Sequence, residues 1–159
     1  MKRLCVALFL IFPIFVCAND QAARAVVSTP SVLSPQDCSI MLIFARAWKY
    51  SPLVEKERAV WIVLNSEGQY EAIDWLHTPQ SRITIWSDAL PDRLVAQAHT
   101  HGDHLEPKPS SQDVSTARTL GIPVLTLTRK GIWKASPNGS VTQEVGRGWY
   151  KKTMDRCGQ

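Results

Sequence analysis

The stretch "AHTHGDHLEPKPSSQD", residues 98–113, constrains this chain more than any other part of it. Two histidines, His99 and His101, stand one residue apart at the end of the β-prone run "RLVAQAHTH". Side chains at positions i and i+2 of a strand point to the same face, so both imidazoles can reach one cation. Asp113 follows where the sequence favours a helix start. The stretch therefore predicts a metal site between a strand end and the first turn of a helix.

The same letters fit two different zinc signatures. His99, His101, Asp103 and His104 spell H-x-H-x-D-H, which resembles the signature of the metallo-β-lactamase superfamily. That superfamily takes further His and Asp ligands from well downstream, and none of the four histidines of this chain lies beyond His104. A metallo-β-lactamase-like hydrolase is therefore kept only as the weaker alternative.

The second signature uses a later carboxylate. His99, His101, Ser110 and Asp113 spell H-x-H…S-x-x-D, which resembles the JAB/MPN+ (JAMM) metalloprotease family, and "PSSQD" is similar to the Pro-Ser-x-x-Asp of its bacterial members. The family pattern has seven residues between the second His and the Ser, and this chain has eight. The additional residue falls within 102–109, in a loop, where insertions are tolerated.

The resemblance also implies a glutamate upstream, at the head of a strand. Glu57 in "EKERAVWIVLN" meets that description, and the segment resembles the E-x-x-V…L pattern of RadC-type JAB domains. Glu55 is the rival, because on a strand it would face the same side. Glu57 is preferred because it is the closer of the two to the apolar run.

These residues together predict zinc-assisted hydrolysis of an amide, and the resemblance to the JAB/MPN+ family implies that the amide is a peptide or isopeptide bond. Two imidazoles and one carboxylate, from His99, His101 and Asp113, leave the fourth position of one tetrahedral Zn²⁺ to water. Glu57 would act as general base and then as general acid toward the leaving amine. The Ser110 hydroxyl would donate to the oxyanion that forms on the attacked carbonyl. The expected partner is a peptide or protein substrate.

Other interpretations of these residues stay open. Ser110 and Asp113 can simply cap a helix, and a JAB-like domain without catalysis would be a binding or scaffold module. His77 is interpreted as a loop histidine, and Asp103 and His104 as loop residues. The net charge of +4 comes from scattered cations rather than a basic stripe, so no nucleic-acid partner is expected.

The remaining pattern predicts one mixed α/β (α+β) domain over residues 34–159, with a JAB/MPN-like sheet flanked by helices. The expected order is helix, strands, metal motif, helix, strands. The first helix would begin with Ser34 as cap, Pro35 at the first position and Asp37 in the first turn. Its apolar face would be Leu42, Ile43, Ala45 and Trp48. The other expected elements are strands at 60–64, 69–76, 82–86 and from about 93, a helix over 110–121, and hairpin turns at 129–131 and 137–139.

The N-terminus has the build of a secretory signal over residues 1–18. Two cations precede an apolar run that is short for a membrane span, followed by small residues. Cleavage is expected after Ala18, with Ala23 or Ala25 as alternatives and a lipoprotein through Cys17 as the weaker one; an uncleaved anchor stays open. Residues 19–33 would form a linker or extended arm. We therefore expect a periplasmic or secreted protein with no membrane span after signal removal.

Export changes the interpretation of the cysteines. Cleavage would leave Cys38 near the start of the mature domain and Cys157 near its end. In an oxidising compartment two remaining cysteines favour a disulfide over a metal pair, with two free thiols as the alternative.

Overall fold

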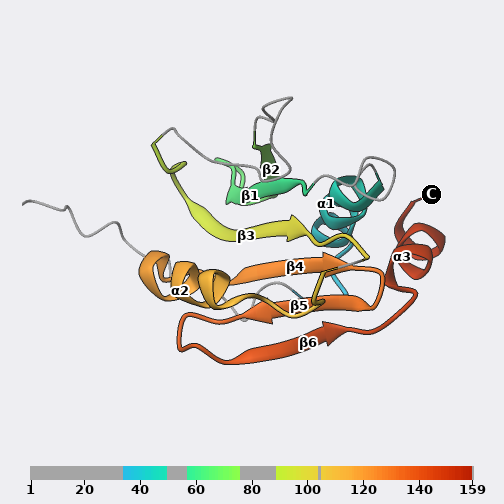
Figure 1. The fold of residues 1–159 in the computed structure, drawn as a ribbon. Coiled ribbons are helices and arrows are strands. Elements are labelled where there is room, and N and C mark those ends of the chain that lie inside the picture. Colours follow the sequence, from blue (N-terminus) through green and yellow to red (C-terminus); the bar gives the residue numbers. More distant parts are fainter. Residues whose placement is uncertain (1–33, 50–56, 76–88, 104, 159) are drawn as a thin grey trace, which may run out of the picture.

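The computed structural model describes residues 34–49, 57–75, 89–103 and 105–158. They form a six-stranded mixed sheet with three helices, which confirms the predicted α+β single-domain class (Figure 1). The strands are β1 (Ala59–Leu64), β2 (Tyr70–Asp74), β3 (Leu94–Thr100), β4 (Val124–Thr128), β5 (Gly131–Ala135) and β6 (Val141–Val145). The helices are α1 (Cys38–Lys49), α2 (Ser111–Leu120) and α3 (Trp149–Cys157).

The strands lie in the order β2-β1-β3-β4-β5-β6, and β3 with β4 is the one parallel pair among them. α2 makes the crossover between these two strands. A parallel pair requires such a crossover, because the chain must return to the same end of the sheet. The end of β3 and the start of α2 are consequently joined by one short segment, and the predicted metal ligands lie at or near its two ends.

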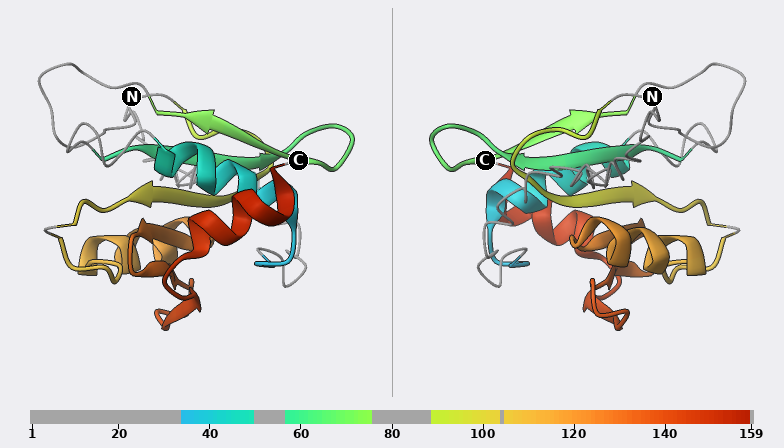
Figure 2. Two further views of the ribbon diagram at one scale, coloured as in Figure 1. Left: turned by 90° about the vertical axis from the view of Figure 1, so that its right-hand side faces the viewer. Right: turned by 90° about the vertical axis from the view of Figure 1, so that its left-hand side faces the viewer.

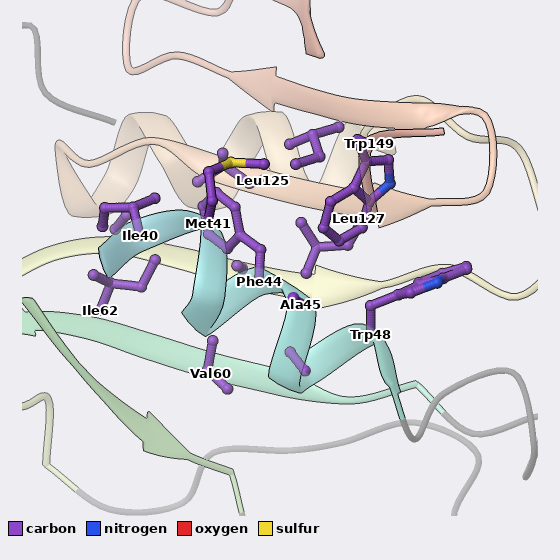
Figure 3. Close-up of a cluster of buried hydrophobic side chains, with 14 of the residues drawn as sticks. Ile40, Met41, Phe44, Ala45, Trp48, Val60, Ile62, Leu125, Leu127 and Trp149 are labelled. Atoms are coloured by element: carbon purple, nitrogen blue, oxygen red, sulfur yellow. The ribbon is translucent and has the colours of Figure 1, made fainter. Parts of the chain in front are cut away.

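Helices cover both faces of the sheet, with α1 and α3 on one face and α2 on the other (Figure 2). The face under α1 carries the larger apolar core, where each fully buried side chain contributes about 1.5–3 kcal/mol. Figure 3 shows this core, whose labelled residues are Ile40, Met41, Phe44, Ala45, Trp48, Val60, Ile62, Leu125, Leu127 and Trp149.

The face under α2 is different, because it buries polar side chains. Its apolar cluster is small and consists of Ala117, Val124 and Ala135, with Val114 packed against it. Side chains alternate along a strand, so every second residue of β3 and β4 points to this face. Most of the buried polar residues of the two strands are among them. They are Gln97, His99, Thr126 and Thr128, and His101 follows directly after β3.

The start of α1 differs from the prediction. The helix begins at Cys38 rather than near Ser34, and residues 34–37 form a turn closed by the bond from Asp37 N to Ser34 O, 2.9 Å. The Asp37 carboxylate accepts from the N–H of Ser39 at 2.8 Å. Asp37 is therefore the residue that caps the helix, because its carboxylate reaches an N–H group that the first turn leaves unpaired.

The buried face of α1 also differs in part from the prediction. Leu42 and Ile43, which were predicted to form the apolar face, are only half-buried, whereas Ala45 and Trp48 are buried as predicted. The rest of the buried face consists of Ile40, Met41, Phe44 and Ala47.

Helix α3 was not predicted, because the expected order of elements ended in strands. Its cap, Gly148, makes no side-chain hydrogen bond, so the local signal for a helix start is weak. Tertiary contacts hold it instead. The Trp149 indole is buried, donates from Nε1 to Thr128 O at 2.8 Å, and lies 6.1 Å from the Trp48 ring.

The other predicted elements have mixed outcomes. The strands at 60–64 and 69–76, the strand leading into the motif, the helix after it and both hairpin turns are confirmed. The predicted disulfide is also confirmed, since Cys38 and Cys157 are bonded, with a Cα–Cα distance of 5.4 Å. The signal, the linker and the strand at 82–86 lie outside the described residues. Within the described part, none of the helices has the length and apolar character needed to cross a bilayer.

Candidate metal centre

The two histidines lie at the end of β3 on the face that α2 covers. Ala98 belongs to the core under α1, so its neighbour His99 points the other way. His99 and His101 are each 8% exposed, and their Nε2 atoms are 3.0 Å apart. The predicted convergence of the two imidazoles is therefore present.

Asp113 approaches the pair from the first turn of α2. Its Oδ1 lies 3.5 Å from His99 Nε2, and one ligand atom from each of His99, His101 and Asp113 lies within 4.8 Å of the others. Zinc bonds of about 2.0–2.1 Å at a tetrahedral angle would separate two ligand atoms by about 3.3 Å. The observed separations of 3.0 and 3.5 Å bracket that value, and the third pair of atoms, from His101 and Asp113, lies within 4.8 Å, so the three residues could hold a metal ion.

Ser110 fixes the direction of the Asp113 carboxylate. The backbone N and the Oγ of Ser110 both donate to Asp113 Oδ2, at 2.7 and 2.8 Å, and Asp113 N donates back to Ser110 Oγ at 3.2 Å. This capping box confirms the predicted helix start at Ser110, and Gly121 ends the helix in the left-handed conformation. Because Oδ2 is occupied by two donors, Oδ1 is the oxygen that faces the imidazoles.

The second nitrogens of the two rings have different surroundings. His101 Nδ1 lies 2.7 Å from the carbonyl oxygen of Glu106, which can only accept a hydrogen bond. His99 Nδ1 is buried and has no hydrogen-bond partner among the described residues. Burial lowers the pKa of His99 to about 4; the negative charge of Asp113 opposes this and His101 reinforces it. His99 is thus neutral near pH 7, the form in which imidazole binds metals.

The half-buried Glu57 lies two residues before Ala59, where the pairing of β1 with β3 begins. Ala59 pairs with His99, and Thr100 N donates to Arg58 O at 2.8 Å, while Arg58 N donates to Thr100 Oγ1 at 2.9 Å. Continued by two pairs beyond Ala59 and His99, this register would set Glu57 opposite His101. Residues directly opposite one another in an antiparallel pair share a face of the sheet. The rival Glu55 lies outside the described residues.

Asp103, which only the weaker zinc signature uses, does not join this group. The exposed Asp103 carboxylate pairs with Arg129 at 2.9 Å, and His104 and His77 lie outside the described residues. In the described part of the chain, the group made by His99, His101 and Asp113 is the one set of three or more potential ligands.

Two contacts at the site carried no sequence signal. Glu106 acts through its backbone carbonyl, which any residue type supplies, and Thr126 donates from Oγ1 to Pro107 O at 2.8 Å across a long sequence gap.

Comparisons with protein-family models, with curated proteins and with solved structures found no match to this chain.

Proposed function

We propose that this chain is a zinc-dependent hydrolase of amide bonds, of the JAB/MPN+ (JAMM) type, acting on peptide or isopeptide bonds. The observation that carries the proposal is the Asp113 carboxylate, which faces a buried imidazole pair with Oδ1 3.5 Å from His99 Nε2. The identity of the donors favours zinc, because two imidazoles with one carboxylate are a common catalytic set for that metal. When bound, one Zn²⁺ would polarise a substrate carbonyl and lower the pKa of a water toward about 7.

Glu57 is the proposed proton carrier. Its carboxylate would take a proton from the attacking water and return it to the nitrogen of the leaving amine. The register of β1 against β3 supports this role, since its continuation beyond Ala59 and His99 would bring Glu57 opposite His101. The buried hydroxyl of Thr100, which accepts from Arg58 N, fixes the backbone next to Glu57.

Ser110 is the proposed donor to the oxyanion. In its capping arrangement the hydroxyl donates to Asp113 Oδ2, so donation to a substrate requires the hydroxyl to turn. The backbone N–H of Ser110 would keep Oδ2 bonded after that turn, at its 2.7 Å contact. The Asp113 carboxylate would therefore keep its orientation while Ser110 acts on the substrate.

We propose an exported location for this activity. The disulfide between Cys38 and Cys157 supports it, because such bonds persist mainly in oxidising compartments. The substrate would then be an extracytoplasmic peptide, a protein tail or a small amide.

The proposal is tested by metal analysis together with cleavage profiling. Purified protein is expected to carry about one zinc per chain and to hydrolyse members of peptide or isopeptide libraries; chelation should stop the reaction and added zinc restore it. A protein without stoichiometric zinc would favour the binding-module alternative. Two metal ions per chain would favour the metallo-β-lactamase-like alternative.

Replacing Glu57 by glutamine should separate catalysis from metal binding. The amide keeps the shape of the side chain but cannot carry a proton, so kcat should fall by about 10²–10⁴-fold. Zinc content should stay unchanged, because Glu57 is not a proposed ligand. Glu67→Gln, the same change at an exposed residue in the turn between β1 and β2, is the matched control and should keep full activity. A Glu57→Gln protein with undiminished kcat would remove Glu57 from the mechanism.

A further inference from the structure

The loop between the metal ligands, residues 102–109, is fastened by two consecutive backbone carbonyls. The carbonyl of Glu106 lies 2.7 Å from His101 Nδ1, and the carbonyl of Pro107 accepts from Thr126 Oγ1 at 2.8 Å. Thr126 is fully buried, and in the parallel register of β3 and β4 it pairs with His99. One side chain of β4 therefore holds the loop directly over the histidine pair.

The first of these contacts decides which nitrogen of His101 carries the hydrogen. A carbonyl oxygen can only accept, so Nδ1 must be the donor, and a neutral ring then leaves a lone pair on Nε2. Nε2 is the atom that lies 3.0 Å from His99 Nε2, within the ligand group. Carbonyl partners of this kind set the tautomer and the ring orientation of metal-binding histidines.

The second contact restrains the first, because the two carbonyls belong to adjacent residues. Pro107 has a fixed φ, and the residue before a proline is confined to extended conformations, so Glu106 has little freedom of its own. Fixing the Pro107 carbonyl therefore also limits where the Glu106 carbonyl can point. Without the Thr126 hydroxyl, the loop would have no side-chain bond from β4 to Pro107.

We propose that Thr126 is a positioning residue for the metal ligand His101. It holds Pro107 in place, and through it the Glu106 carbonyl that keeps the lone pair of His101 on Nε2. The test by zinc affinity rests on the proposed function, because it requires the metal site. The test by NMR spectra of the histidine tautomer depends on the hydrogen bonds alone.

Three variants test this role through zinc affinity, measured by competition with a chelating dye. Thr126→Val keeps the shape of the side chain but removes the hydroxyl. Loss of a group that orients a metal ligand lowers metal affinity by about 10–100-fold, and we expect the lower value, about tenfold, for this variant. Thr126→Ser keeps the hydroxyl and should restore the affinity. Thr128→Val is the matched control, because Thr128 is also buried on β4, and among the described residues its hydroxyl bonds only within the turn, to Lys130 and Gly131.

A second measurement needs no zinc. Long-range ¹⁵N–¹H spectra of the metal-free, unmutated protein should show His101 as the Nδ1–H tautomer, and Thr126→Val should show a mixture. An Nε2–H tautomer in the unmutated protein overturns the inference, as does a Thr126→Val protein with unchanged tautomer and zinc affinity. If the unmutated protein binds no zinc, the proposed function fails, and the spectra still decide the role of Thr126.

Discussion

Asp113→Asn is expected to remove zinc from the protein and to abolish hydrolysis. The asparagine can keep the cap, since its amide oxygen can accept from Ser110, but it loses the negative charge that faces the imidazoles. If the roughly 10–16 kcal/mol of a four-ligand zinc site is shared evenly, one ligand is worth about 3–4 kcal/mol, or about 10²–10³-fold in affinity. Metal analysis and the cleavage assay, with circular dichroism to verify folding, measure the effect.

Asp103→Asn is the matched control for this variant. It is the same chemical change in the same segment, at an exposed carboxylate that pairs with Arg129. Zinc content and hydrolysis should both be retained. Loss of metal from Asp103→Asn, with Asp113→Asn unaffected, would contradict the ligand set and favour the metallo-β-lactamase-like arrangement.

Removing the disulfide is expected to have the largest effect on stability. Cys38 and Cys157 are separated by 119 residues, and a cross-link over so long a loop stabilises by about 4–5 kcal/mol in the chain-entropy model. That is a large share of the roughly 5–15 kcal/mol typical of a domain. The Cys38→Ser/Cys157→Ser protein should therefore unfold at a clearly lower guanidinium concentration.

The control for this experiment is a reductant. Dithiothreitol should lower the unfolding midpoint of the unmutated protein to that of the double variant and leave the double variant unchanged. Zinc content of the folded protein should not change, because the bond joins α1 to α3 on the face opposite the metal centre. Equal midpoints for oxidised and reduced protein would show that the helix contacts suffice without the bond.

The metal centre could be predicted from the sequence because its ligands lie close together in the chain. The alternation that brings His99 and His101 to one face and the spacing of Ser110 and Asp113 in a capping box are local properties. The convergence of the three ligand residues then required only a strand end followed by a helix start. The roles of Glu57 and Ser110 in catalysis stay predictions.

The features that the sequence did not reveal depend on distant contacts. Helix α3 has no capping side chain, and its Trp149 is held by β4 and by α1. The start of α1 was placed too early because Ser34 and Asp37 both suit a cap, and only the observed bond to Ser39 distinguishes them. Thr126 acts on Pro107, 19 positions away, through a carbonyl that has no residue-specific signal.

The two donors from Ser110 also limit the denticity of Asp113. With Oδ2 bonded to both the N–H and the hydroxyl, the carboxylate offers a single oxygen, so it is a monodentate partner for any ion beside the histidines. Calcium takes six to eight oxygen atoms, often from bidentate carboxylates, so a carboxylate that offers one oxygen would suit it poorly. The cap of one short helix would thereby disfavour calcium at the candidate site.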